Sequence, residues 1–187
     1  MKKLIVALAL VAVAAVAEAG AFKWSTNMGQ AIYLPGTTTK VSSGTAYLFD
    51  ANTYAVTTLL DAFVGDDGID FSMAMSSKAV SSSGAIAATT TDAVTSSQDY
   101  SLYFAIVNGD NVFISDVKGV VGPDGDKTTT VAYSPSTASK AVVSEWTAGT
   151  ETAASGWYTA AAAAPEPTSG LLLLLGVAGL ALRRRRA

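Results

Sequence analysis

Residues 100–117 read YSLYFAIVNGDNVFISDV, and this stretch decides the fold. Two runs of aromatic and β-branched residues, 100–107 and 112–117, flank Asn108-Gly109-Asp110-Asn111. The Asn-Gly pair supplies the positive φ that a tight reversal requires, so the stretch predicts a β-hairpin. The first run is apolar on both faces: Tyr100, Leu102, Phe104 and Ile106 lie on one, and Tyr103, Ala105 and Val107 on the other. We therefore expect its strand to be central in the sheet and covered on both sides.

Short β-prone segments lie on both sides of this hairpin and are separated by Gly, Pro and Ser turn signals. They are residues 22–26, 30–34, 45–49 and 71–80 before the hairpin, and 128–133 and 156–159 after it. In the fourth segment Phe71, Met73 and Met75 alternate with Ser and Ala, which predicts one buried face. The Ser-rich residues 81–97 are expected to add one or two edge strands around Ala85-Ile86-Ala87.

Residues 52–65 carry the helical signal of the chain. The apolar residues at positions i, i+3, i+4 and i+7, which share one helix face, are Val56, Leu59, Leu60 and Phe63. Asn52 or Thr53 is the expected N-cap and Gly65 the expected stop, so we predict a helix over about residues 53–63. The predicted fold class is mainly β: an antiparallel β-sandwich or partly open barrel with one short helix.

The N-terminus has the three parts of a secretory signal peptide. Met1-Lys2-Lys3 is a basic start, residues 4–16 are apolar, and Ala17-Glu18-Ala19 is a small-x-small cleavage motif. We predict a signal peptide over residues 1–19 that uses the Sec export machinery and is cut after Ala19. Cleavage before Phe22, after Ala19-Gly20-Ala21, is the alternative site, and an uncleaved N-terminal anchor is the alternative to cleavage.

The C-terminus carries a second membrane-directed segment. Residues 171–182 contain no charged residue and are followed by Arg183, Arg184, Arg185 and Arg186. The apolar run is shorter than the about 20 residues of a full helical span, so it requires a locally thinned bilayer or arginines that reach the headgroups. The arginines favour the cytoplasmic side, which places the rest of the chain outside. Pro165 and Pro167 oppose helix formation and favour an extended linker that a protease can reach.

Residues 165–187 closely resemble the PEP-CTERM sorting signal of Gram-negative bacteria, because Pro165-Glu166-Pro167 precedes a short apolar segment and a terminal Arg cluster. The resemblance implies that a membrane-embedded exosortase recognises Pro165, Glu166 and Pro167 and removes the tail, with the arginines as the stop-transfer cluster. It also implies transient anchoring in the inner membrane, a final place at the cell surface or in the extracellular matrix, and a link to exopolysaccharide and biofilm. The alternatives are an uncleaved tail anchor and, through Leu34-Pro35-Gly36-Thr37, a sortase-type signal.

These signals divide the chain into a signal peptide (1–19), a β-rich extracellular domain (22–160), an Ala/Pro linker with the PEP motif (161–169) and a transmembrane sorting tail (170–187). Residues 22–164 contain six lysines, thirteen acidic residues and no arginine, which is a net charge of minus seven. Such a body lacks the positive charge that nucleic-acid binding requires. The chain has no cysteine and no histidine, which excludes disulfides, Cys/His or Ser-His-Asp catalysis and the usual zinc sites.

Four aromatic residues are candidates for contact with a glycan: Trp24, Trp146, Trp157 and Tyr158. A carbohydrate-binding module for exopolysaccharide requires such side chains to be exposed and coplanar. The alternative, which we favour, is that they pack in the core or at a sheet edge, because tryptophan is usually well buried.

Four carboxylates gather in ten residues: Asp61, Asp66, Asp67 and Asp70. Asp66, Asp67 and Asp70 form a weak Ca²⁺ candidate in a Gly-containing loop, although the spacing does not match an EF-hand. Paired carboxylates also serve hydrolases, but adjacent acids in such a loop are expected to be solvated and ionised. We therefore expect a non-enzymatic, exported surface or matrix protein with no metal and no cofactor. A carbohydrate-binding module and a carboxylate-based hydrolase are the alternatives.

Overall fold

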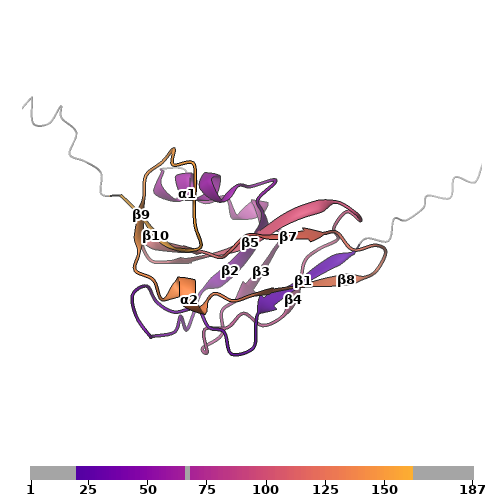
Figure 1. The fold of residues 1–187 in the computed structure, drawn as a ribbon, viewed down its shortest axis with the longest axis horizontal. Coiled ribbons are helices and arrows are strands. Elements are labelled where there is room, and N and C mark those ends of the chain that lie inside the picture. The colour runs from indigo at the N-terminus through magenta and orange to yellow at the C-terminus, as the bar shows by residue number, and fades with distance from the viewer. Residues whose placement is uncertain (1–19, 66–67, 162–187) are drawn as a thin grey trace, which may run out of the picture.

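The computed structural model describes residues 20–65 and 68–161, and Figure 1 shows their arrangement. The strands in this part of the chain are β1 (Ala21–Thr26), β2 (Thr45–Asp50), β3 (Ser76–Ala79), β4 (Thr89–Thr90), β5 (Asp99–Asn108), β6 (Asn111–Ile114), β7 (Lys118–Val121), β8 (Thr128–Tyr133), β9 (Ser144–Trp146) and β10 (Gly156–Ala160). The helical segments are α1 (Val56–Val64), the 3-10 turn η1 (Phe71–Met73) and α2 (Ser136–Ser139). None of these helices is long and apolar enough to cross a bilayer, and the predicted transmembrane tail lies outside the described residues.

The strands form two sheets. The larger has the order β3-β2-β5-β6-β10-β9, with β7 also paired to β5, and the smaller has the order β4-β1-β8. Most pairs are antiparallel, but β1 and β8 are parallel, as are β9 and β10. A hydrogen bond from the Ser76 hydroxyl to the Thr90 carbonyl (3.2 Å) links β3 to β4 across the two sheets. The prediction of a mainly β, open two-sheet fold with one short helix is confirmed, and the two parallel pairs are an addition to it.

The predicted hairpin is present as β5 and β6. Asn108 pairs with Asn111, so the loop consists of Gly109 and Asp110 alone. The positive φ falls on Gly109 (59°), whereas Asp110 is not in the left-handed region. A glycine at the first of two loop positions is typical of a type II′ turn, which matches the twist of the two strands. After β6 the Phe104 amide of β5 donates to the hydroxyl of Ser115 (2.9 Å) and not to a backbone carbonyl, which interrupts the ladder. Strands β6 and β7 therefore pair with β5 as two separate segments.

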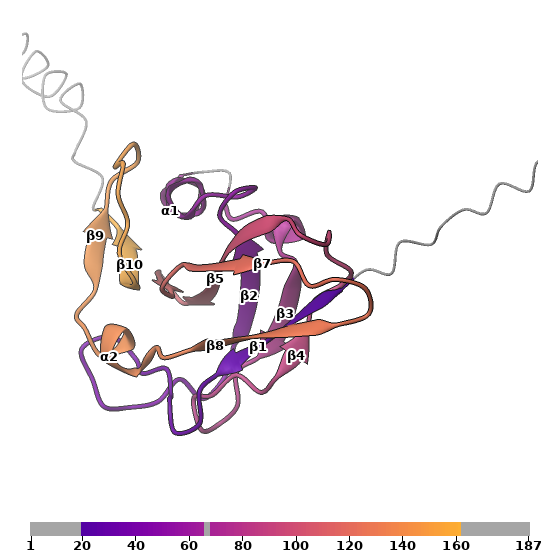
Figure 2. The same ribbon diagram turned by 45° about the vertical axis from the view of Figure 1, so that its right-hand side comes forward.

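Strand β5 lies between two cores, as its two apolar faces predict. The face with Tyr100, Leu102, Phe104 and Ile106 packs with residues of the smaller sheet, such as Trp24 and Tyr133. The opposite face, with Tyr103 and Ala105, packs with Leu59 and Leu60 of α1. Figure 2 shows the resulting layers: α1 on one side of the larger sheet, and β1, β4 and β8 on the other. Both faces of β5 are therefore removed from water.

Helix α1 begins later than the sequence predicts, because its expected capping residues belong to a turn. The amides of Thr53 and Tyr54 donate to the Asp50 carbonyl (3.0 and 2.8 Å), and the Asn52 amide donates to Asp50 Oδ1 (3.1 Å). The N-cap is Ala55, with no side-chain cap, so the assignment of Asn52 or Thr53 to this role is wrong. Gly65 is the C-cap, as predicted.

Three of the predicted strand segments differ in the structure: residues 71–80 form a strand only in part, and residues 30–34 and 85–87 form only isolated bridges. Asp70 Oδ1 accepts from the amide (3.0 Å) and hydroxyl (2.6 Å) of Ser72, and this cap turns residues 71–73 into a 3-10 turn. Phe71 and Met73 are each 37% exposed, and β3 is limited to Ser76–Ala79. Residues 30–34 contribute an isolated bridge through Tyr33, and residues 85–87 contribute one through Ile86. Helix α2 was not foreseen.

Candidate functional site

The residues predicted for sorting lie outside the described part of the chain. They are Ala17, Ala19, Pro165, Glu166, Pro167 and Arg183 to Arg186, and the same holds for Asp66 and Asp67 of the calcium candidate. What the structure does define is the folded body to which both signals are attached. The geometry of its two ends determines how closely the processing enzymes must approach it.

The C-terminal end of the body is strand β10, held between β6 and β9. The indole of Trp157 is buried and donates to the carbonyls of Tyr33 (2.9 Å) and Ser139 (3.0 Å), which ties β10 to α2 and to the 27–44 loop region. The hydroxyl of Tyr158 donates to the Ala154 carbonyl (2.6 Å) and accepts from its amide (2.8 Å). The last strand is thus fixed by side-chain hydrogen bonds as well as by its ladder.

This order continues to Ala161, whose amide donates to the Trp146 carbonyl (3.1 Å). Pro165 is four positions further along the chain. Four residues can span at most about 14 Å. A protease that acts at the Pro-Glu-Pro motif therefore works close to the surface formed by β9, β10 and the β5–β6 turn.

The N-terminal end of the body is Gly20. Its carbonyl accepts from the Val94 amide (2.8 Å), and the next amide, that of Ala21, donates to the Lys127 carbonyl (3.1 Å). A side chain at position 20 would place its Cβ 2.5 Å from the Pro123 carbonyl oxygen, so only glycine fits there without movement of that loop. Gly20 is therefore part of the folded body, directly after the predicted cleavage site.

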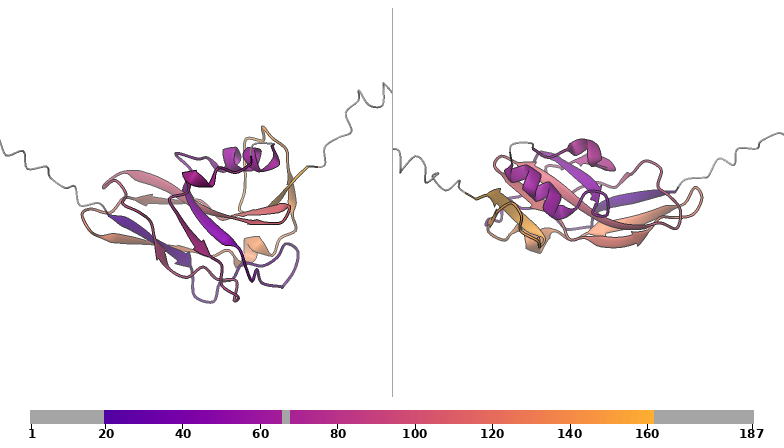
Figure 3. Two further views of the ribbon diagram at one scale, coloured as in Figure 1. Left: turned by 180° about the vertical axis from the view of Figure 1, so that it is seen from behind. Right: turned by 90° about the horizontal axis from the view of Figure 1, so that it is seen from above.

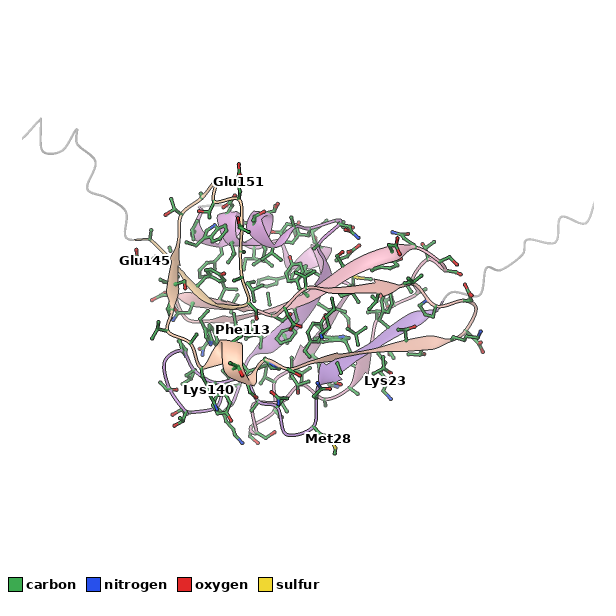
Figure 4. The ribbon with its side chains drawn as sticks, viewed as in Figure 1. Lys23, Met28, Phe113, Lys140, Glu145 and Glu151 are labelled. Atoms are coloured by element: carbon green, nitrogen blue, oxygen red, sulfur yellow. The ribbon has the colours of Figure 1, made fainter. Side chains whose placement is uncertain are left out.

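The two ends lie at opposite ends of the molecule. Figures 1 and 3 show β1 starting at one extremity of the long axis and β9 and β10 at the other. Figure 4 shows Glu145 and Glu151 on the side of β9 and β10, Lys140 below them beside α2, and Lys23 below β1 in the other half of the molecule. A body attached to a membrane through β10 would accordingly hold its N-terminal end away from that attachment.

The aromatic residues considered for glycan contact are all buried. Their exposed fractions are 0% for Trp24, 3% for Trp146, 1% for Trp157 and 7% for Tyr158. Trp24 belongs to the core between the sheets, and Trp146 stacks edge-on against Tyr158 with ring centroids 5.6 Å apart. These four side chains pack in the core or at a sheet edge, as favoured from the sequence. They do not form the exposed, coplanar surface that a glycan site on them requires.

The described carboxylates of the acidic segment have structural partners. Asp61 Oδ1 accepts from the Trp146 indole (2.8 Å) and from the Gly149 amide (3.2 Å), which joins α1 to the segment after β9. Asp70 caps η1, and the hydrogen bonds from the Ser72 side chain and backbone hold the pKa of Asp70 below its usual value. Within residues 20–65 and 68–161 no three metal-ligating side chains come together.

The family described as the PEP-CTERM protein-sorting motif matches residues 163–186 of the chain. The chain matches no curated protein and no solved structure. The chain is thus an exported protein with a C-terminal sorting tail. That tail is a PEP-CTERM motif, which marks the protein as a target of exosortase with transient membrane anchoring.

Proposed function

We propose that this chain is a non-enzymatic protein of the cell surface or extracellular matrix, exported by the Sec machinery and released from its tail by exosortase. The observation that carries the proposal is the sorting motif at residues 163–186, which follows a body whose described hydrogen bonds reach Ala161. The motif directs the sorting of the chain, and the β-rich body is the part that reaches the cell surface or matrix.

The position of the two ends supports an order of events. Before processing, the apolar segments at both ends of the chain favour the membrane, whereas β1 and β10 lie toward opposite ends of the body. Signal-peptide cleavage frees the Gly20 end, so that the body is held through β10 alone. Cleavage near Pro165 to Pro167 then separates the body from the inner membrane.

The non-enzymatic role is supported by the chemistry of the side chains. Histidine and cysteine are absent from the chain, and the described carboxylates Asp61 and Asp70 are occupied by hydrogen bonds that hold local structure. A body with a net charge of minus seven also has no attraction for nucleic acid. A structural protein at the cell surface requires no histidine, no cysteine and no reactive carboxylate.

The proposal is tested by tracking the tail in cells with and without exosortase. Glu166→Ala changes the recognition motif, and Glu151→Ala, an exposed acid in the β9–β10 segment, is the matched control. We expect wild-type protein and the control to lose the tail in the presence of exosortase, and the Glu166→Ala variant to stay in the membrane fraction. Equal tail removal in all three proteins, or in cells without exosortase, would contradict the proposal.

A further inference from the structure

A small hollow lies where η1 covers the end of β2 and the start of β5. It has a volume of about 260 Å³ and is lined by Asp50, Thr53, Met73, Met75, Gln98 and Tyr100. Pockets for drug-sized ligands measure about 300–1,000 Å³, so this hollow suits a smaller molecule, of the size of one sugar ring. None of its lining residues belongs to the sorting motif or is one of the tryptophans considered above.

The fixed polar group of the hollow is the carboxylate of Asp50, which is only 4% exposed. Its Oδ1 accepts from the amides of Asn52 (3.1 Å) and Ser101 (2.9 Å), and its backbone carbonyl holds the turn before α1. Within the described residues, Oδ2 has no hydrogen-bond partner. Unlike the Trp24 indole and the Tyr133 hydroxyl, this oxygen is not sealed in the interior, so a donor placed in the hollow can reach it.

The remaining side chains of the hollow indicate which class of ligand can donate to Asp50 and also contact the other lining residues. Thr53 contributes a hydroxyl and Gln98 an amide, and both residues are exposed at the surface. Met73, Met75 and the ring of Tyr100 supply apolar contact, and no cationic residue lines the hollow among the described residues. A sugar ring has hydroxyl donors for the carboxylate, further hydroxyls for the amide, and C–H groups for the thioethers and the ring. A simple ammonium ion would use only the carboxylate.

We propose that this hollow binds a single neutral pyranose unit, with Asp50 Oδ2 as the acceptor for a ring hydroxyl and Gln98 as a second polar contact. The inference rests on the proposed function in one respect, because an extracellular location is what brings the body to polysaccharide. Acidic sugars are disfavoured, since a uronate would bring a second negative charge to Asp50 on a body that already has a net charge of minus seven.

The test uses saturation-transfer difference NMR on the protein as cells make it, processed or whole. The probes are the methyl glycosides of glucose, mannose and galactose, with glucuronate and methylammonium for comparison. Asp50→Asn keeps the Oδ1 acceptor and replaces Oδ2 with a donor, so the turn is retained while the proposed contact is lost. Gln98→Ala is an independent variant at an exposed position just before β5, and Asp99→Asn, an exposed acid at the first position of β5, is the matched control for charge.

We expect binding of at least one neutral glycoside, weaker binding of glucuronate, and a loss of about tenfold or more in Asp50→Asn, because a hydrogen bond to a charged group is lost. Gln98→Ala should also weaken binding, and Asp99→Asn should not. The proposal is overturned by an absence of glycoside binding, by glycoside binding in Asp50→Asn and Gln98→Ala that equals that of the wild-type protein, or by displacement of the glycosides by methylammonium alone. The mass of the same preparation reports tail removal, so the failure of this site is distinguishable from failure of the proposed function.

Discussion

Two buried tyrosines provide a sharp test of the packing between the layers. Tyr133 of β8 is fully buried, and its hydroxyl has no hydrogen-bond partner among the described residues. Tyr103 of β5 is equally buried, but its hydroxyl donates to the Tyr54 carbonyl (2.8 Å). Burial raises the pKa of both hydroxyls, so both are neutral in the folded protein. Replacement by phenylalanine removes the same atom from two different environments.

The two substitutions should change the free energy of unfolding in opposite directions. Tyr133→Phe removes a buried, unpaired hydroxyl whose desolvation costs about 1–3 kcal/mol, and it keeps the edge-on contact of this ring with Phe104 (5.0 Å). Allowing for the small void that is left, we expect a gain of about 1 kcal/mol. Tyr103→Phe loses a hydrogen bond and leaves the Tyr54 carbonyl unpaired, which should cost about 1–2 kcal/mol. The difference between the variants is then about 2–3 kcal/mol.

Urea unfolding of the mature protein, followed by tryptophan fluorescence, measures both values. All three tryptophans are buried, so their emission reports the loss of the core. With an unchanged m-value, the shift in midpoint gives the change in stability directly. If Tyr133→Phe is as destabilising as Tyr103→Phe, the Tyr133 hydroxyl is satisfied in the folded protein and the reasoning about this core is refuted.

Three further outcomes are expected. Asp61→Ala should lower the free energy of unfolding by about 1–3 kcal/mol because the Trp146 indole loses its acceptor, whereas Asp61→Asn should retain most of it; equal urea midpoints for the two variants would show that this contact is not made. Gly20→Ala should lower the thermal midpoint of unfolding because the new Cβ would lie 2.5 Å from a carbonyl oxygen, and a chain that starts at Phe22 should also be less stable. An unchanged midpoint in both variants would show that Gly20 is not part of the folded body. Hydrogen bonds from serine hold the pKa values of Asp70 and Asp124 below the usual 3.8. The unfolded state therefore binds more protons, and the free energy of unfolding falls as the pH drops below about 4. Urea midpoints between about pH 5 and 2.5 should fall less steeply in the Asp70→Asn/Asp124→Asn variant than in the wild-type protein, and an identical slope would contradict the assignment.

The sequence predicts elements best where local pattern and tertiary demand agree. In β5 both faces are apolar, and the structure places α1 on one and the smaller sheet on the other. At residues 71–75 the alternation of apolar and small residues favours a strand, but Asp70 and Ser72 form a local cap that the period of the apolar residues does not report. Side-chain to backbone hydrogen bonds of this kind compete with strand pairing.

Long-range pairing and buried polar contacts could not be read from the chain. The parallel pairing of β1 with β8 joins segments about a hundred residues apart, and nothing in either segment specifies its partner. Likewise, Asp50 looks like an ordinary turn residue in the sequence, and the hollow beside it arises only when η1 is folded over β2 and β5. By contrast, the sorting motif is a linear signal and was predicted from the sequence alone.

The intact mass of the mature protein, isolated from the bacterium that exports it, tests the account most directly. We expect a chain that starts at Gly20 and ends near Pro165 to Pro167, because the described fold begins at Gly20 and its hydrogen bonds reach Ala161. A mass that includes the signal peptide, or a C-terminus that still carries Arg183 to Ala187, would contradict it.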